Sequence, residues 1–197
     1  MKTILIILAV LIALVIISQL YFAMAKTETQ RYKVIKSEKD FEIRLYPPAT
    51  MATISMNAKT YKELSSSGFR KLASFIFGGN KDKKSIAMTT PVHMDINDKQ
   101  SNMSFVMPAN YTKDNLPKPD DSSVNIKTTT EEYVAAIRFG GYANDEEIKK
   151  YAEKLEAALK ASGIEYSGNF RFLGYNAPYQ FLGRKNEIIV SVLWNEK

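Results

Sequence analysis

The chain of 197 residues contains no cysteine and only one histidine, His93. The lack of cysteine excludes disulfide bonds, thiolate metal sites, cysteine nucleophiles and covalent heme attachment. A single histidine excludes metal sites built from several imidazoles, and a Ser-His-Asp triad would have to use His93. The G-x-S-x-G, H-E-x-x-H and G-x-G-x-x-G motifs are also missing. We therefore expect a protein that is not an enzyme, unless the fold alone brings acidic residues together.

Long runs of one charge are absent as well. The 27 lysines and arginines are scattered among 21 acidic residues, which gives a formal net charge of +6. A nucleic-acid-binding surface usually shows a concentrated basic stripe, so we predict no nucleic-acid partner. The composition is 45% hydrophobic and 24% charged, which is typical of a globular protein, and the length suits one domain.

The N-terminus carries an uninterrupted apolar run from Ile4 to Ile17, which continues to Ala25 with only Ser18 and Gln19 as polar residues. A helix of this length could span the roughly 30 Å hydrocarbon layer of a membrane. The small residues before Lys26 also fit the cleavage site of a secretory signal peptide. We therefore predict a membrane anchor or signal peptide over residues 1–25, with the membrane contacted by residues 4–25. Residues 26–197 then form a domain outside the cytoplasm.

Two segments have the periodicity of amphipathic helices. In the first, residues 60–77, the apolar side chains Leu64, Leu72 and Ile76 recur on one face. In the second, residues 144–162, Asn144 or Asp145 is expected to be the N-cap, and Gly163 ends the helix. Alternating or short apolar runs predict strands at residues 31–36, 41–46, 49–57, 85–96, 103–108, 124–129, 133–139, 169–175 and 187–194.

A faint internal repeat relates these elements. An offset of 83 residues superposes Ile54 on Ile137 and Leu72 on Leu155. Each half then has the order strand, helix, strand, strand. This order predicts an α+β fold with antiparallel strands.

Several sequence blocks resemble the signature segments of the SOUL heme-binding protein family. In order, they are FEIRLYPP, FIFGGNK, IAMTTPV, SFVMP, FGGYA and YNAPYQFLGRKNEIIV, and they extend from about Arg31 to Trp194. The resemblance implies a distorted barrel of two four-stranded antiparallel sheets, with two packed helices in a pseudo-twofold arrangement. It also implies non-covalent binding of heme or a related tetrapyrrole in an open apolar cleft, for carriage or buffering. The fold is similar, too, to domains that bind other small molecules.

The first predicted helix offers candidate heme-binding residues. Phe69, Ala73 and Phe77 follow one another at four-residue spacing beside the core face and could form an apolar wall. Arg70 and the lysines at 81, 83 and 84 could bind the heme carboxylates. Alternatively, the stripe only widens the core face and the lysines are solvated.

His93 is a candidate axial heme ligand or an ordinary strand histidine. Side chains alternate along a strand, so His93 and Met94 face opposite ways and cannot ligate the same iron. The predicted cofactor-binding residues are thus Phe69, Arg70, Ala73 and Phe77 together with His93. Whether His93 ligates the iron is left open. Two alternatives to heme binding are a module for another lipophilic molecule and a protein-interaction domain.

Overall fold

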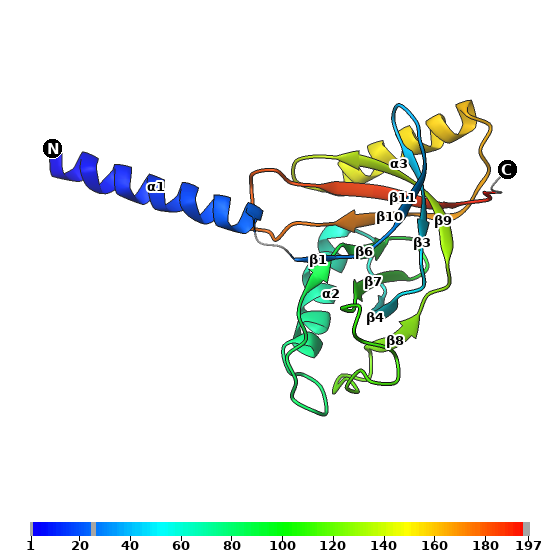
Figure 1. Cartoon of the computed structure of the whole chain (residues 1–197), viewed down its shortest axis with the longest axis horizontal. Coiled ribbons are helices and arrows are strands. Elements are labelled where there is room, and N and C mark those ends of the chain that lie inside the picture. The colour runs from blue at the N-terminus through cyan, green and yellow to red at the C-terminus, as the bar shows by residue number, and fades with distance from the viewer. Residues whose placement is uncertain (1, 25–26, 195–197) are drawn as a thin grey trace.

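The computed structural model describes residues 2–24 and 27–194. Helix α1 (Lys2–Met24) precedes the domain, and Figure 1 shows it as one long helix. Large apolar side chains along it, such as Ile4 and Ile17, are exposed. Within residues 2–24 and 27–194, no helix is both long enough and apolar enough to cross a membrane. The predicted membrane anchor over residues 4–25 is not supported by this finding, and the possible cleavage point Ala25 lies outside the described residues.

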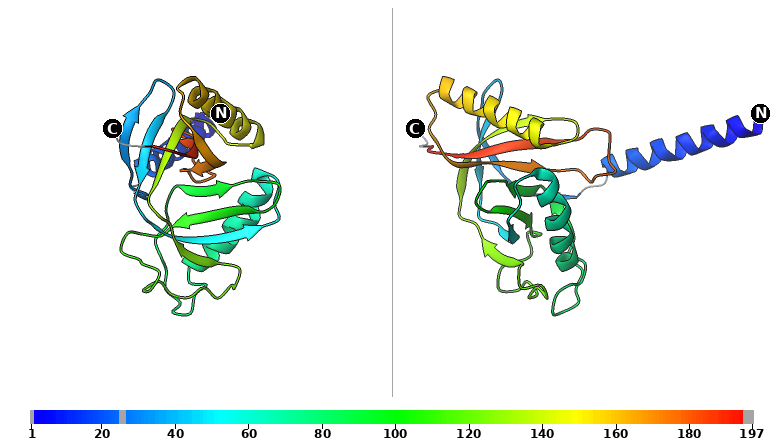
Figure 2. Two further views of the ribbon diagram at one scale, coloured as in Figure 1. Left: turned by 90° about the vertical axis from the view of Figure 1, so that its right-hand side faces the viewer. Right: turned by 180° about the vertical axis from the view of Figure 1, so that it is seen from behind.

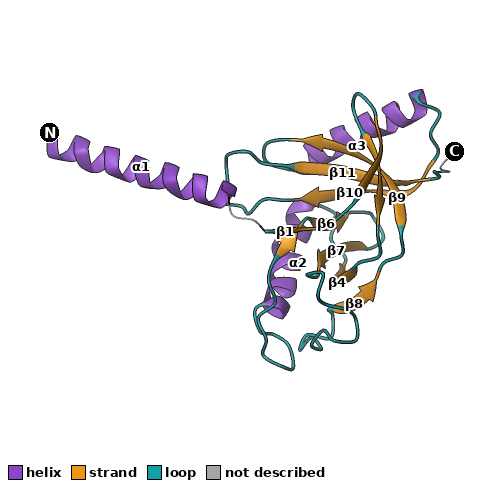
Figure 3. Ribbon diagram, viewed as in Figure 1, coloured by secondary structure: helices purple, strands orange, loops and turns teal. Residues whose placement is uncertain are grey.

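Among the described residues, nine strands form a single sheet in which all neighbours are antiparallel, in the order β2-β3-β9-β11-β10-β6-β7-β4-β8. Their bounds are β2 (Lys33–Ser37), β3 (Glu42–Tyr46), β4 (Thr50–Met56), β6 (Val92–Asp95), β7 (Ser101–Val106), β8 (Asn125–Thr128), β9 (Glu132–Phe139), β10 (Tyr166–Gly174) and β11 (Asn186–Val192). A two-residue strand β1 (Glu28–Thr29) pairs in parallel with β5 (Thr89–Thr90). The predicted α+β class is confirmed, and Figure 3 shows the strands and helices.

The prediction of a barrel made of two separate four-stranded sheets is wrong, because the strands form one continuous sheet. Strand β10 pairs with β6, with Leu173 opposite His93, and this pairing joins the two halves into one sheet. In the described part of the chain the sheet ends at β2 and β8, which do not pair with each other. The sheet is therefore open.

The predicted repeat is visible in the order of the elements. The first half runs β4, α2 (Tyr61–Ile76), β6, β7, and the second runs β9, α3 (Asp145–Ala161), β10, β11. Outward from the central pair β6 and β10, the sheet continues as β7-β4-β8 on one side and β11-β9-β3 on the other, where β2 is added at the edge. Ile54 and Ile137, related by the offset of 83 residues, are both buried.

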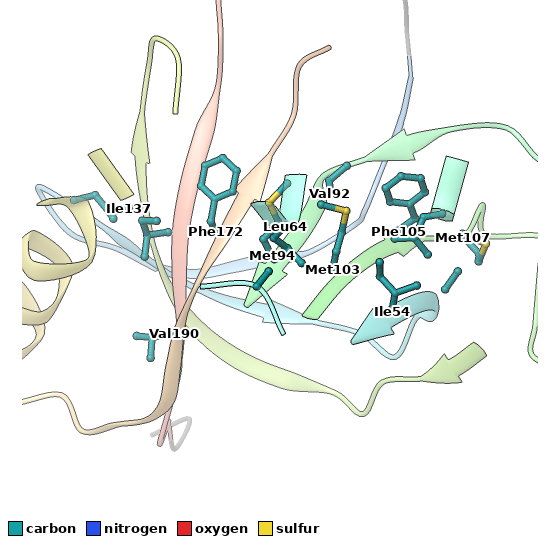
Figure 4. Packing of buried hydrophobic residues seen from close by; sticks show 14 of the residues in the cluster. Ile54, Leu64, Val92, Met94, Met103, Phe105, Met107, Ile137, Phe172 and Val190 are labelled. Atoms are coloured by element: carbon teal, nitrogen blue, oxygen red, sulfur yellow. The ribbon is translucent and has the colours of Figure 1, made fainter. Parts of the chain in front are cut away.

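Helices α2 and α3 cover the same face of the sheet. Leu64 of α2 and Leu155 of α3 belong to one apolar cluster with side chains of both sheet halves, including Met103 and Ile188. Figure 2 shows both helices against the sheet from behind, and Figure 4 shows part of this core. The opposite, helix-free face carries a smaller apolar cluster and most of the buried polar groups of the strands.

Side chains fix where the two helices begin. Thr60 caps α2 by accepting a hydrogen bond from the Glu63 amide, and Asn144 caps α3 by accepting one from the Glu147 amide. Asp145 accepts a hydrogen bond of 2.6 Å from the Tyr61 amide. Asn144 is therefore the cap of the second helix, while Asp145 ties the start of α3 to the start of α2.

Candidate ligand-binding site

The apolar stripe predicted on the first helix is partly exposed. Phe77, just beyond α2, is 67% exposed, and Phe69 is 38% exposed while its ring packs edge-on against Phe105 at 5.2 Å between centroids. Ala73 is half-buried and Arg70 is exposed on the same helix. These residues form a surface on the outside of the domain, and they line none of the three cavities described below.

The loop after α2 uses its lysines in local ion pairs. Lys81 and Lys83 both bind Asp120, at 3.0 and 2.8 Å, and Lys84 lies 3.6 Å from Asp82. Hydrogen bonds from the two lysines lower the pKa of the exposed Asp120 carboxyl. The lysine group therefore has carboxylate partners within the chain, so these lysines are less available to bind heme carboxylates.

Asn80 organises the same loop from inside. Its side chain is fully buried, and its amide donates to the carbonyls of Phe75 and Lys84 at 3.0 and 2.7 Å. Its oxygen accepts a hydrogen bond of 3.1 Å from the Lys84 amide. The neighbouring Gly79 must lack a side chain, because a Cβ there would lie 2.6 Å from the Ser74 carbonyl oxygen. The FIFGGNK block therefore has a structural role.

Replacing Asn80 by alanine is expected to lower the free energy of unfolding by about 2–4 kcal/mol, because its side chain loses one buried hydrogen bond to Phe75 and two partly buried ones to Lys84. Urea unfolding of Asn80→Ala measures the loss. The exposed Asp82→Ala variant in the same loop is the control and should change stability by less than about 0.5 kcal/mol. Equal stability of the two variants would contradict the structural role of Asn80.

His93 lies on the helix-free face of the sheet, away from the α2 stripe. The His93 ring Nε2 is 2.7 Å from the Gln30 side-chain oxygen, while Met94 belongs to the core on the opposite face. Burial lowers the pKa of His93 to about 3, and the positive charges of Arg171 and Lys127 act in the same direction. The imidazole is therefore neutral at pH 7. Because Phe69 packs on the other side of the sheet, the structure does not bring His93 together with the predicted residues of α2.

A large groove at the edge of the sheet is not predicted from the sequence. Its volume is about 990 Å³, and it lies where β2 passes the end of α3 and the end of β11. It is lined by Lys33, Val34, Ile35, Lys36, Ser162, Gly163, Ile164, Glu165, Leu193 and Trp194. Val34 is 44% exposed and Leu193 is 69% exposed, which is unusual for large apolar side chains beside a sheet. These two exposures give the groove an accessible apolar wall.

Backbone hydrogen bonds hold together the segments that line this groove. Helix α3 ends in a Schellman motif, in which Gly163 has a positive φ of 64° and the Ile164 amide donates to the Leu159 carbonyl. The Leu193 amide in turn donates to the Glu165 carbonyl. Ile164 and Leu193 are thus held on neighbouring segments that lie far apart in sequence.

The volume and the lining of the groove suit a planar ligand that has an apolar ring and carboxylate groups at its edge. Small-molecule sites usually have volumes of about 300–1,000 Å³, and the other two cavities measure about 370 and 270 Å³. Lys36 Nζ lies 6.0 Å from the Trp194 ring and 2.6 Å from Glu38, and Lys33 is exposed at the rim. Apolar side chains could contact a tetrapyrrole ring while the exposed Lys33 meets a carboxylate, whereas Lys36 already has Glu38 as its partner. No histidine lines this groove.

A buried ionic cluster lies elsewhere, on the helix-free face. The Arg44 guanidinium donates to both carboxylate oxygens of Glu187, at 2.9 and 3.0 Å, and its Nε donates to Glu42 at 2.7 Å. Tyr175 donates a hydrogen bond of 2.6 Å to Glu187, and Lys185 Nζ lies 3.1 Å from it. Burial alone would raise the pKa of Glu187, but the hydrogen bonds and charge of Arg44 bring it below its ordinary value. Glu187 is therefore ionised at neutral pH.

Comparison with known proteins identifies relatives across most of the chain. A sequence model of the family described as SOUL heme-binding protein matches residues 27–191. Heme-binding protein 1 of Xenopus laevis is 29% identical over 165 residues, which are 79% of this chain and 86% of the relative. Heme-binding protein 2 of Homo sapiens is 28% identical over 156 residues, with 75% and 76% covered.

Solved structures share the fold at low sequence identity. The crystal structure of the EcmrR C-terminal domain has a TM-score of 0.56 and 10% identity, and the match covers 82% of this chain and 98% of that one. A structure described as a hydrolase from Listeria innocua has a TM-score of 0.54 and 9% identity, with 81% and 94% covered. At such identities the likeness concerns the fold alone.

Proposed function

This chain belongs to the SOUL heme-binding protein family, and on that premise we propose that it binds heme or a related tetrapyrrole reversibly and non-covalently. The family match over residues 27–191 carries the proposal, and two relatives named as heme-binding proteins support it. A role in carriage or buffering agrees with a binding family and with a chain that has no recognisable catalytic motif. The location of the domain outside the cytoplasm stays a prediction.

We place the ligand in the groove beside β2. The observation that supports this site is its volume of about 990 Å³ combined with an accessible apolar wall. Val34, Leu193 and Trp194 would contact the ring, and the exposed Lys33 would bind a carboxylate. Because ion pairs at exposed sites contribute little, apolar contact supplies most of the affinity in this arrangement.

The α2 stripe is the second candidate position. Phe77 is exposed and Arg70 has no ion pair within residues 2–24 and 27–194, so both remain available to a ligand. The residues of this surface line none of the three cavities, and ligand sites are normally concave. Concavity therefore favours the groove over the stripe.

A pair of matched double variants distinguishes the two positions. Val34→Asp with Leu193→Asp places two carboxylates in the groove, where they remove apolar contact and repel an anionic ligand. The expected dissociation constant for hemin, followed by absorbance at the Soret band, rises by about a hundredfold, as two losses of about 1.4 kcal/mol imply. The control, Phe69→Asp with Phe77→Asp on the stripe, should bind hemin like the unchanged chain.

The hemin affinities of the two double variants also identify the alternatives to the groove. Weaker binding only by the stripe variant would move the site to α2 and overturn the groove assignment. Saturable binding that neither variant changes would exclude both surfaces. If the unchanged chain shows no saturable response to hemin but binds an apolar dye at the groove, the ligand is another lipophilic molecule.

A further inference from the structure

A second cavity lies at one end of the sheet, away from the groove beside β2. Its volume is about 370 Å³, and it is lined by the start of β4, the ends of β7 and β8, and the segment 28–31 that contains β1. It shares no lining residue with the groove. A ligand in this cavity would therefore be bound independently of a ligand in the groove.

The buried part of the lining is apolar. Val106 and Met107 are 5% and 4% exposed. The Thr89 hydroxyl donates a hydrogen bond of 2.5 Å to the Val106 carbonyl, and the Met107 amide donates one of 2.8 Å to the Thr50 carbonyl. Three prolines and a tyrosine add further apolar surface, namely Pro47, Pro48, Pro108 and Tyr111. The polar groups at the bottom are thus used within the chain, and the cavity offers mainly apolar contact there.

Two side chains of opposite charge lie at the exposed rim of this cavity. Glu28 and Arg31 both line it, and both are exposed. Glu28 Oε1 accepts a hydrogen bond of 2.9 Å from the Ala109 amide, which fixes the position of the carboxylate. Within residues 2–24 and 27–194, neither Glu28 nor Arg31 forms an ion pair with the other or with a third residue. The rim therefore presents one carboxylate and one guanidinium to a ligand.

An apolar cavity below these two charges suits a small zwitterion. A guanidinium binds a carboxylate through charge-assisted hydrogen bonds, and a carboxylate binds an ammonium group in the same way. A free amino acid carries both groups beside its side chain, whereas an anion alone would be repelled by Glu28 and a cation alone by Arg31. Small-molecule sites usually measure about 300–1,000 Å³, so a volume of about 370 Å³ indicates a ligand at the small end of that range.

We propose that this cavity binds apolar amino acids or dipeptides as zwitterions. The ligand ammonium group contacts Glu28, the ligand carboxylate contacts Arg31, and the apolar side chain packs against Met107. This function is additional to heme binding and does not depend on it.

The test is an NMR titration of the full chain with L-phenylalanine, observed at the methionine methyl groups. Met107 lines the cavity, whereas Met94 belongs to the core and does not line it. The expected result is a saturable shift of the Met107 methyl resonance at millimolar phenylalanine, without a shift at Met94. Glycine has the same two charges but no apolar side chain, and it should cause no saturable shift.

Analogues of phenylalanine and two variants assign the charged contacts. N-acetylphenylalanine lacks the ammonium group and phenylalanine amide lacks the carboxylate, so each should bind about fivefold more weakly, as expected for charge contacts at an exposed rim. In Glu28→Gln, the advantage of phenylalanine over N-acetylphenylalanine should disappear, while glutamine can still accept the Ala109 hydrogen bond. In Arg31→Gln, the advantage over phenylalanine amide should disappear.

Three results would overturn the proposal: no saturable shift at Met107, an equal shift at Met94, or an undiminished preference for phenylalanine over the matching analogue in either variant. Arg31→Gln should bind hemin like the unchanged chain, because Arg31 does not line the groove. Since phenylalanine binding is measured without hemin, a failure of heme binding would leave its result unaffected. The two proposals therefore fail separately.

Discussion

Acidification from pH 6.5 towards pH 3 is expected to lower the free energy of unfolding by about 1.4 kcal/mol per pH unit through His93 alone. Burial lowers the pKa of His93 in the folded protein to about 3, whereas the unfolded chain titrates near the ordinary value of 6.5. Between these values the unfolded state binds the proton and the folded state does not. Stability from this group is therefore complete above pH 6.5 and falls as the pH decreases towards 3.

The comparison that isolates this effect is between the unchanged chain and His93→Gln. Glutamine cannot titrate, yet it can still form a hydrogen bond with the Gln30 side chain, which lies 2.7 Å from His93. Urea unfolding between pH 6.5 and 5 avoids most carboxylate titration and should give a clearly shallower pH slope for the variant. Identical slopes for the two proteins would show that His93 is accessible to protons in the folded state.

Replacing Glu187 by alanine is expected to lower the free energy of unfolding by about 3–5 kcal/mol. The cost arises because Arg44, with its side chain only 5% exposed, keeps its charge and loses its bidentate partner. The pKa of Glu187 is lowered in the folded protein, so its contribution is present above the ordinary carboxyl pKa and is lost as the pH falls below it. Chemical denaturation at pH 7 measures the difference.

A double variant checks the physical cause of this loss. Arg44→Met with Glu187→Leu removes both charges but keeps similar volume, and such replacements of buried ion pairs are often neutral. It should be more stable than Glu187→Ala, although Tyr175 and Lys185 also lose their partner in it. The exposed Lys149 and Glu153 pair, 3.9 Å apart, is the surface control, and its removal should cost less than about 0.5 kcal/mol. A loss below about 1 kcal/mol for Glu187→Ala would contradict the buried ion pair.

The elements that could be predicted from sequence are those with local causes. Helices α2 and α3 follow from apolar residues at helical spacing, such as Leu64 and Leu72, and α3 also from its cap at Asn144. The opposite directions of His93 and Met94 follow from strand alternation and are confirmed by their different neighbours. In each case, residues a few positions apart determine the structure.

The sheet and the sites depend on contacts between distant segments. The pairing of β6 with β10 places His93 opposite Leu173, and no local pattern specifies that partner. Arg44 and Glu187 are separated by 143 positions, and each is an ordinary charged residue in its own strand. The groove is formed by β2, the end of α3 and the end of β11. Among its lining residues, Val34 and Leu193 are the exposed large apolar side chains.

The most direct measurement is a hemin titration of the unchanged chain and of His93→Ala, followed at the Soret band. His93 is buried against Gln30 and does not line the groove, so it should not contact the bound heme. The predicted result is saturable binding at micromolar hemin, with the same dissociation constant and the same spectrum in both proteins. Absence of a saturable change in the unchanged chain would contradict heme binding. Loss of a low-spin spectrum in His93→Ala would contradict binding in the groove and identify His93 as an iron ligand.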